Sequence, residues 1–323
     1  MNYTQVLEQI EQLKTGKKMP DADNILEKIS VQNIIYIPAD YEYDFVGELL
    51  ELLLKEQKYS VGRFTPYAIK SPVGHILCQG KSISQKDFTV YAEEVLGEIK
   101  NNMKTFFRTE VNCSIAFKYF LNKNVDFIIW PSLHKCSIEG LKEVLSEASV
   151  LEREKVALNV ILSFLKEQGI LIKEKQIEKV FKNYKGEGKF EVLTKKPYFV
   201  ADGAEDGNSV KLLMAKLQYA YPDNPYIFIV GVLQEGYEDV IKESARMAQC
   251  IITLTPPEME NAMPGIDTAK EYSKYNHNIT TASSVEEAVE IAKLLGEKNT
   301  VTVAFGTTAI LDRYRSLLLQ KKL

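Results

Sequence analysis

Hydrophobic and polar residues near the start of the chain follow two kinds of spacing. Residues 34–37 form a short apolar run, residues 45–56 place leucines at helical spacing, and residues 59–65 form a second run that favours a strand. Short runs of β-branched and aromatic residues are typical of strands, whereas apolar residues three and four apart are typical of amphipathic helices. This segment therefore predicts a strand, a helix and a second strand.

The rest of the first half is predicted to be mainly helical. Two short amphipathic helices precede the first strand, at residues 4–14 and 21–29, with Thr4 and Asp21 as N-caps. A third buried strand is predicted at residues 125–130. The other predicted helices span residues 84–103, 109–121, 151–165 and 177–184. The first half is thus predicted to form an α/β domain.

Strands and helices alternate regularly in the second half of the chain. Short β-rich runs are predicted at residues 198–201, 226–230, 250–254 and 300–304. The predicted helices between and after them span residues 209–218, 237–248, 284–295 and 308–319. This alternation is typical of a parallel, doubly wound sheet, so the second half is predicted to be a small Rossmann-like α/β domain.

The boundary between the two predicted domains falls at residues 184–188. This stretch, Tyr-Lys-Gly-Glu-Gly, places two glycines and charges of both signs between segments of regular periodicity. Glycines that interrupt a periodic pattern are typical of turns and connections. We therefore expect a first domain over residues 1–185 and a second over residues 186–323.

The composition excludes several classes of protein. Of the 323 residues, 45% are hydrophobic and 26% are charged, as is typical of globular chains, and a net charge of −4 argues against a nucleic-acid partner. The chain starts without the basic and apolar regions of a signal peptide, and no apolar run is long enough to span a membrane. We therefore expect a cytoplasmic protein that binds no membrane. The four cysteines are scattered, which fits reduced thiols: Cys78, Cys113, Cys136 and Cys250.

The turn after the first strand is the most informative feature of the chain. In phosphate-binding proteins such a turn is rich in glycine and ends in a lysine and a hydroxyl residue, and its N–H groups bind phosphate oxygens. Residues 38–44 contain no glycine and no lysine, but they carry three carboxylates. A triphosphate would meet negative charge and bulky rings here. The segment predicted to be a degenerate phosphate loop comprises Ala39, Asp40, Tyr41, Glu42, Tyr43, Asp44 and Phe45.

Eight short blocks, in the order found in a known family, cover most of the chain. They are residues 61–66, 79–88, 116–120, 125–129, 188–193, 202–206, 228–233 and 305–308. In these blocks the chain resembles the folylpolyglutamate synthase and dihydrofolate synthase family, within the Mur ligase group of ATP-dependent amide ligases. The resemblance implies a trimmed, P-loop-type domain like the central domain of Mur ligases over residues 1–185. It also implies a Rossmann-like domain of the Mur ligase C-terminal type over residues 186–323.

The chain departs from this family at residues that the ligase reaction needs. Tyr43 takes the place of the phosphate-loop lysine, and Phe45 that of the serine that helps to hold magnesium. Residues 130–135 replace a metal-binding glutamate and a glycine cluster, and a long stretch with a histidine metal ligand and a lysine is absent after Ser137. Arginine, histidine and asparagine of the later motifs have become Lys189, Glu205 and Asp206.

These departures predict a pseudoenzyme. Phosphoryl transfer depends on positioned electrostatic groups, and loss of one such group typically lowers the rate by about a hundred- to a thousandfold. We therefore expect no catalytic residue and no cofactor, and a role in binding a protein partner, such as an active synthase or another biosynthetic enzyme. Two alternatives stay open. One is an active ligase that uses ATP and magnesium through atypical contacts on a folate or amino-acid substrate, and the other is a small-molecule sensor.

The resemblance further implies a ligand cleft between the two domains. Its predicted residues are Gly80, Lys81, Ser82, Lys189, Asp202, Glu205, Asp206 and Asn208. Glu205 and Asp206 would repel a carboxylate, since two like charges about 4 Å apart cost roughly 4 kcal/mol near a protein surface. A protein partner or an amine is therefore expected instead of glutamate, and a folate-like ligand stays open. Residues 202–209 have a simpler interpretation as an acidic loop in which Asn208 or Ser209 caps the next helix.

Three other features have a structural and a functional interpretation. Residues 40–44 either place acids at a helix N-terminus, where the helix dipole favours them, or form a contact surface of exposed tyrosines to which Trp130 adds. His134 and Cys136 are too few ligands for zinc, so no metal is expected there. The pair His75 and Cys78 flanks a predicted strand, where packing accounts for it.

Overall fold

The structure is a computed structural model of the chain. It describes residues 1–14, 33–66, 72–100, 107–148, 152–184, 186, 188–257, 259 and 261–319. The helix predicted at residues 21–29 lies outside these residues. The chain divides into two compact units, Met1–Lys185 and Gly186–Leu323, and the division falls within the glycine-containing stretch at residues 184–188.

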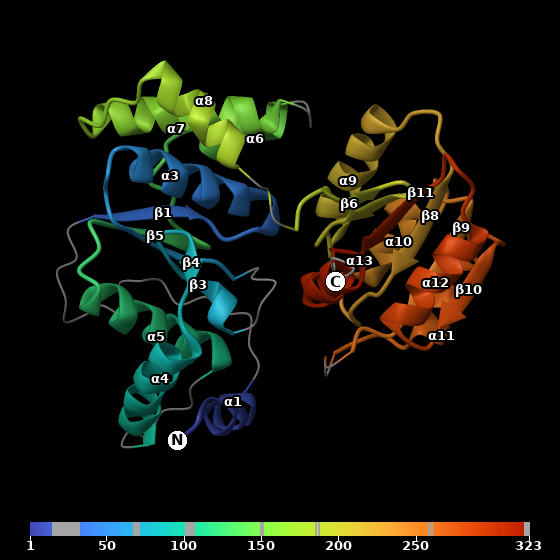
Figure 1. Ribbon diagram of the computed structural model, residues 1–323, viewed down its shortest axis with the longest axis horizontal. Coiled ribbons are helices and arrows are strands. Elements are labelled where there is room, and N and C mark those ends of the chain that lie inside the picture. The colour runs from blue at the N-terminus through green and yellow to red at the C-terminus, as the bar shows by residue number, and fades with distance from the viewer. Residues whose placement is uncertain are drawn as a thin grey trace. The chain divides into compact units, whose positions relative to one another are not determined.

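The first unit contains a five-stranded sheet in the order β1-β5-β2-β3-β4 (Figure 1). Its strands are β1 (Ile34–Pro38), β5 (Phe127–Ser132), β2 (Val61–Phe64), β3 (Ile76–Cys78) and β4 (Lys81–Ser82). The first three strands of this order are parallel, and β3 and β4 continue the sheet as an antiparallel hairpin. β5 starts two residues later than predicted and continues through Pro131 and Ser132, because both stay in register with β1.

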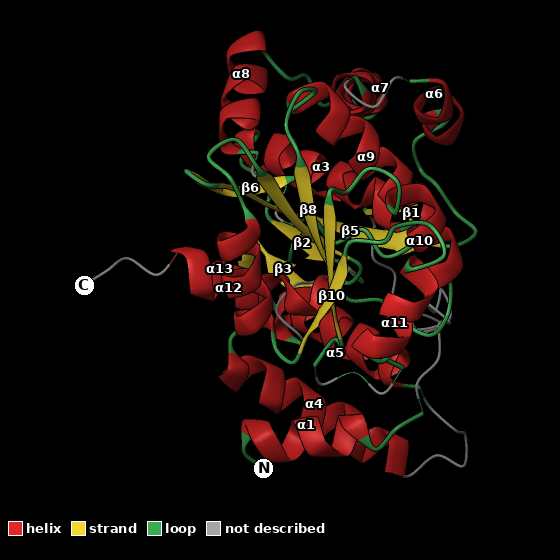
Figure 2. Ribbon diagram, turned by 90° about the vertical axis from the view of Figure 1, so that its right-hand side faces the viewer, coloured by secondary structure: helices red, strands yellow, loops and turns green. Residues whose placement is uncertain are grey.

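Helices cover both faces of this sheet (Figures 1 and 2). On one face lie α3 (Asp44–Glu56), α6 (Leu141–Glu147), α7 (Arg153–Glu167) and α8 (Glu174–Asn183). On the other lie α1 (Tyr3–Glu11), α4 (Gln85–Lys100) and α5 (Arg108–Asn122). Successive residues of β1 point to opposite faces, so that Ile35 packs with the first group of helices and Tyr36 with the second.

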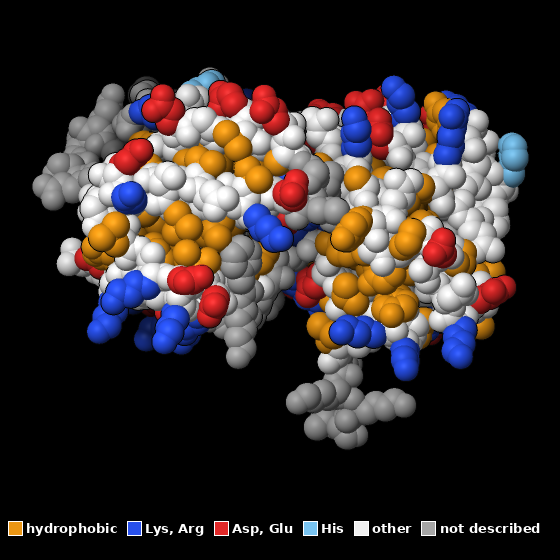
Figure 3. Space-filling view, turned by 90° about the horizontal axis from the view of Figure 1, so that it is seen from above, with side chains coloured by type: hydrophobic (Ala, Val, Ile, Leu, Met, Phe, Trp, Pro, Cys, Tyr) orange, Lys and Arg blue, Asp and Glu red, His pale blue; other side chains and the backbone are white. Residues whose placement is uncertain are grey.

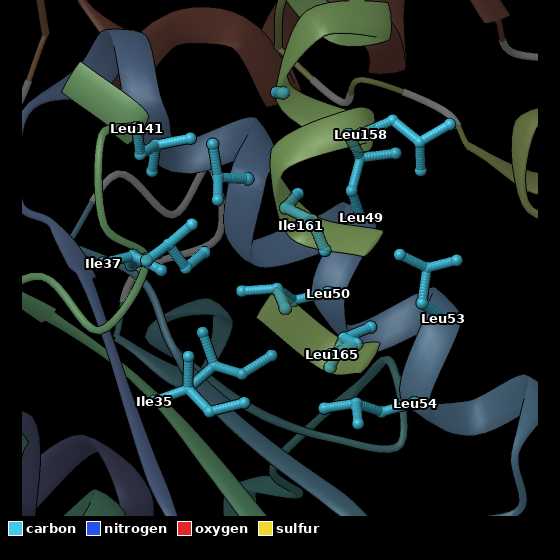
Figure 4. Close-up of a cluster of buried hydrophobic side chains, with 14 of the residues drawn as sticks. Ile35, Ile37, Leu49, Leu50, Leu53, Leu54, Leu141, Leu158, Ile161 and Leu165 are labelled. Atoms are coloured by element: carbon cyan, nitrogen blue, oxygen red, sulfur yellow. The ribbon is translucent and has the colours of Figure 1, made fainter. Parts of the chain in front are cut away.

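The leucine-rich spacing of residues 45–56 forms the centre of one core. Leu49, Leu50, Leu53 and Leu54 of α3 are fully buried. They pack between β1 and α7, which contributes Leu158, Ile161 and Leu165 (Figure 4). This apolar layer positions the first turn of α3 beside the end of β1, where the candidate loop lies.

The first helix starts earlier than predicted. α1 spans Tyr3–Glu11, and its N-cap is Asn2 rather than Thr4. The Asn2 side chain accepts a hydrogen bond from the N–H of Gln5 over 2.9 Å, and the Gln5 side chain accepts one from the N–H of Asn2. This reciprocal capping box satisfies two N–H groups at once, which a cap at Thr4 would not do.

The second unit contains a six-stranded sheet in the order β10-β9-β8-β11-β7-β6. Its strands are β6 (Glu191–Lys195), β7 (Tyr198–Ala201), β8 (Tyr226–Val230), β9 (Cys250–Leu254), β10 (Ile279–Ala282) and β11 (Val301–Phe305). All neighbours are parallel except the edge strand β6, which runs antiparallel to β7. The parallel, doubly wound sheet predicted for this half is therefore confirmed.

The helices of the second unit follow the strands closely. They are α9 (Gly207–Ala220), α10 (Tyr237–Ser244), α11 (Gly265–Tyr272), α12 (Val285–Leu295), the 3₁₀ turn η3 (Thr308–Ile310) and α13 (Leu311–Leu319). The sequence patterns missed β6, β10 and α11, which are short and only partly buried. None of the helices among the described residues is long and apolar enough to cross a membrane.

Candidate functional site

The loop between β1 and α3 holds the segment predicted to be a degenerate phosphate loop. Two main-chain hydrogen bonds define its path. The N–H of Ala39 donates to the carbonyl of Ser132 at the end of β5, and the N–H of Tyr43 donates to the carbonyl of Asp40, each over 3.0 Å. The 3₁₀ turn η1 (Tyr41–Tyr43) then leads directly into α3. The loop is therefore a tight turn joined to the neighbouring strand.

The two aromatic side chains at the start of α3 point into the core. Tyr43 is 7% exposed and Phe45 is 5% exposed, and both belong to the hydrophobic cluster around α3. Burial, followed by the charge of Glu42, raises the pKa of Tyr43 above its ordinary value. The interpretation of Tyr43 as an exposed interface anchor is wrong, because its ring is covered by the protein itself.

The three carboxylates of the loop are all engaged by neighbouring side chains. Glu42 pairs with Arg153 over 2.8 Å, and Asp40 lies 4.0 Å from the ammonium of Lys142. Asp44 accepts a hydrogen bond from the hydroxyl of Thr65 over 2.7 Å. Because Asp44 lies in the first turn of α3, its charge also offsets the positive end of the helix dipole.

The start of α3 has no side-chain cap. The N-cap of α3 is Tyr43, whose side chain makes no capping hydrogen bond. The acids therefore act on the helix through their charge and not as caps. Each of the three carboxylates has a cation within 4.0 Å, since Asp44 also lies 3.9 Å from Arg63, so a phosphate at this N-terminus would have to displace one of these pairs.

Sequence reasoning missed the basic residues that hold the loop. The guanidinium of Arg153 donates to the carbonyl of Leu145 over 3.1 Å and to Glu42, and it lies 5.8 Å from the centre of the Tyr43 ring. Lys142 lies 6.0 Å from the same ring. More than a hundred residues separate Arg153 from Glu42, so no local pattern could indicate the pair.

The segment at Gly80, Lys81 and Ser82 is the turn and second strand of the β3–β4 hairpin. Gln79 and Gly80 both have positive φ, 55° and 74°, which is the geometry of a two-residue type I′ turn. Lys55 donates to the carbonyl of Gln79 over 2.8 Å. All three predicted site residues are exposed. The positive φ of this turn is therefore sufficient to explain the presence of glycine at position 80.

In the second unit, Asp202 is a buried carboxylate that organises two loops. It accepts hydrogen bonds from the N–H of Phe190 over 2.7 Å and from the N–H of Ala204 over 2.8 Å. Burial raises the pKa of Asp202, whereas these two bonds lower it. Phe190 has a positive φ of 50°, a conformation that is uncommon for a bulky residue. Asp202 therefore has a structural role in this loop.

The acidic segment after β7 caps α9, but through a different residue than predicted. Asp206 is the N-cap and accepts a hydrogen bond from the N–H of Ser209 over 2.9 Å, and the Ser209 hydroxyl accepts from the N–H of Asp206 over 3.2 Å. Asn208 is exposed in the first turn, and Glu205 is half-buried. The predicted cap at Asn208 is wrong, and Ser209 forms the other half of a capping box.

The turn before β6 contains Lys189, whose N–H donates to the carbonyl of Gly186 over 2.8 Å. The next strand begins at Glu191, which pairs with the guanidinium of Arg315 on α13. Arg315 also lies 3.2 Å from Asp312. Sequence reasoning missed this pair as well, and it anchors α13 to the edge strand β6.

His75 and Trp130 contact neighbouring residues of the fold, whereas His134 and Cys136 lie at the surface. His75 lies at the end of η2 (Val73–His75), and its Nδ1 is 2.7 Å from the carbonyl oxygen of Thr65. His134 and Cys136 are exposed, and the described residues contain no group of three or more side chains able to hold a metal. Trp130 is fully buried between Phe64 and Phe117, so it belongs to the core and not to a contact surface.

The predicted site residues are divided between the two units, and within the first unit residues 39–45 lie at the start of α3 whereas the hairpin turn contacts Lys55 near its end. Residues 39–45 and 80–82 belong to the first unit, and Lys189, Asp202, Glu205, Asp206 and Asn208 belong to the second. Each unit carries acidic and basic side chains together on the face shown in Figure 3. This face is not the uniformly basic surface that is typical of nucleic-acid binding.

Comparison with known proteins identifies the class of protein that this fold defines. No family model matches the chain. The folylpolyglutamate synthase of Mycobacterium tuberculosis complexed with ADP has a TM-score of 0.81 at 12% identity, covering 99% of this chain and 98% of that chain. The folylpolyglutamate synthase of Thermotoga maritima has a TM-score of 0.74 at 18% identity, covering 98% of this chain and 97% of that chain. The chain has the α/β fold of folylpolyglutamate synthases.

A curated relative supports the same assignment at the level of sequence. The chain is 25% identical over 246 residues to the dihydrofolate synthase/folylpolyglutamate synthase of Buchnera aphidicola subsp. Acyrthosiphon pisum (strain APS). The match covers 73% of this chain and spans 59% of the length of that relative. The resemblance to the folylpolyglutamate synthase and dihydrofolate synthase family that the eight blocks indicated is confirmed.

Proposed function

We propose that this folylpolyglutamate synthase-like chain has lost ATP-dependent ligase activity and acts by binding, without a cofactor and in the cytoplasm. One observation carries the proposal. The loop between β1 and α3, where the family resemblance implies a phosphate cradle, is filled by the buried ring of Tyr43 and by carboxylates that pair with the protein's own side chains.

The physical argument concerns what a nucleotide would have to displace. A phosphate approaching the start of α3 would have to compete with Glu42 and Asp44 for their partners, which are Arg153, Arg63 and the hydroxyl of Thr65. These carboxylates are held in place by the folded chain, so the competition favours them over a free phosphate. A phosphate loop gains affinity from glycine N–H groups and a lysine, and residues 38–44 supply neither. These effects together disfavour the binding of a nucleotide at this loop.

Calorimetric titration of the full chain with ATP and magnesium tests this proposal. We expect no saturable heat at millimolar nucleotide. The folylpolyglutamate synthase of Mycobacterium tuberculosis, whose structure contains ADP, is the matched positive control. A micromolar dissociation constant for the wild-type chain would contradict the proposal. It would support instead an active amide ligase, and the next assay would then be product formation with a folate and glutamate.

The bound species is proposed to be a protein partner, such as an active synthase or another biosynthetic enzyme. The acidic loop after β7 supports this choice over glutamate. Glu205 is half-buried and Asp206 is exposed, so both place negative charge where the family has histidine and asparagine. A basic group of a partner, or a small amine, suits this charge better than a carboxylate ligand does.

A further inference from the structure

The β1–α3 loop is joined to the α6–α7 pair by an ion pair that differs from the other charged contacts of the loop. Arg153 is 9% exposed, and its guanidinium bonds both to the last turn of α6, at the carbonyl of Leu145, and to the carboxylate of Glu42. The side chain of Glu42 is 25% exposed. The contact therefore connects two helices and the loop at a place that water reaches poorly.

A buried guanidinium needs an anion beside it. Removal of one partner of a buried ion pair is strongly destabilising, because the other charge is left without compensation in a medium of low dielectric constant. Arg153 is also placed over the ring of Tyr43, 5.8 Å from its centre, so its position is set by the aromatic side chain as well as by its hydrogen bonds. The donors of Arg153 are thus held towards the position that the carboxylate of Glu42 occupies.

We propose that Arg153 forms a latent oxyanion site that Glu42 fills from within, and that this contact holds the β1–α3 loop closed. The inference rests on the proposed function and deepens it, since it names the contact that closes the degenerate loop. Nη2 of Arg153 donates to Glu42 while Nη1 donates to the carbonyl of Leu145, and the N–H groups of a guanidinium bind a carboxylate or a phosphate group, which sets the chemistry of the site. When Glu42 leaves, a free oxyanion takes its place.

The neighbouring pair on the same loop provides a matched control. Asp40 and Lys142 lie 4.0 Å apart, and their side chains are 59% and 47% exposed. Exposed ion pairs contribute little to stability. Asp40→Ala therefore removes the same charge from the same loop while leaving the partly buried contact between Glu42 and Arg153 in place.

Amide hydrogen exchange of the full chain tests the proposal. In Glu42→Ala we expect the amides of residues 39–45 to exchange about tenfold faster than in the wild type, while the strands of the first unit keep their protection. Asp40→Ala should exchange like the wild type. Inorganic phosphate or acetate should restore slow exchange in Glu42→Ala, sodium chloride at equal ionic strength should not, and neither oxyanion should slow exchange in the wild type.

Each outcome decides the proposal. Unchanged exchange in Glu42→Ala, equal acceleration in Asp40→Ala, or failure of both oxyanions to restore protection would overturn it. If Glu42→Ala loses its fold, Glu42→Gln keeps the shape of the side chain without the charge and takes the same test. Micromolar MgATP binding by the wild type would contradict the proposed function. The proposed role of the contact between Arg153 and Glu42 is tested separately, by the amide exchange rates.

Discussion

The guanidinium of Arg63 on β2 pairs with the carboxylate of Glu51 on α3, with 2.9 Å between Nε and Oε2. The two side chains are 11% and 3% exposed. The second oxygen of Glu51 is buried without a hydrogen-bond partner. This ion pair connects α3 to β2. Both side chains are largely buried, so either charge without its partner would raise the free energy of the folded state.

We expect Arg63→Ala to lower the free energy of unfolding of the first unit by about 3–5 kcal/mol, because Glu51 is left as an unpaired buried charge. The double variant Arg63→Met/Glu51→Leu removes both charges and should recover most of this loss. Urea denaturation followed by the fluorescence of Trp130, the single tryptophan of the chain, measures both variants. Equal losses in the single and double variants would show that packing, and not charge, explains the effect.

Two glycines of the first unit should respond to alanine in opposite ways. A Cβ at Gly62 would lie 2.6 Å from Cδ1 of Phe120, inside the core, so Gly62→Ala should destabilise by about 1–3 kcal/mol. A Cβ at Gly97 on α4 would meet nothing within 4 Å. Gly97→Ala should therefore stabilise by about 0.5–1 kcal/mol, because alanine favours the helix. Thermal unfolding of the two variants gives the comparison, and a loss of stability in both would contradict it.

The stability of the first unit should depend on the titration of His75. Burial lowers the pKa of His75 below its ordinary value of 6.5, so the folded protein binds a proton here less readily than the unfolded chain does. The contribution of the neutral ring is therefore complete above pH 6.5 and is lost as the pH falls from 6.5 through the folded-state pKa. The slope reaches at most about 1.4 kcal/mol per pH unit for one group.

Urea denaturation of wild type and His75→Gln between pH 5 and pH 8 (roughly the range in which histidine titrates) isolates this effect. The difference in unfolding free energy between the two proteins should change with pH below 6.5 and be constant above it. His277 is exposed in the second unit, so His277→Gln is the control and should keep the slope of the wild type. A parallel pH dependence of His75→Gln and wild type would argue against the assignment.

Partner capture should depend on the charge of the acidic loop in the second unit. The double variant Glu205→His/Asp206→Asn restores the residue types of the family, and asparagine at 206 still caps α9. We expect it to capture less partner from native extract than the wild type does. Glu243→Gln removes an exposed charge from α10 and serves as control. Undiminished capture by the double variant, or tight binding of glutamate by the wild type, would contradict a cationic partner site.

Local patterns predicted most of the fold, and they failed where an element depends on its neighbours. The leucine spacing of residues 45–56 predicted α3, and four apolar runs predicted β7, β8, β9 and β11, because each of these elements is buried along its length. β6 and β10 lie at the two edges of their sheet, and only one of the four residues of β10 is buried. An edge strand has a neighbouring strand on one side only and is less covered by the rest of the protein, so its sequence shows a weaker hydrophobic pattern.

Residue types and spacings within a few positions were enough to predict the α/β class and the order of the elements, and they showed that residues 38–44 contain neither glycine nor lysine. Which side chains fill and hold this loop depends on contacts between residues that are far apart in the sequence. In the folded chain the side chain of Tyr43 is buried in the core, Arg153 pairs with Glu42, and Asp202 accepts a hydrogen bond from the N–H of Phe190. Burial and charge pairing join residues that are far apart in the chain, and the energy of such a contact depends on the water that the assembled fold excludes.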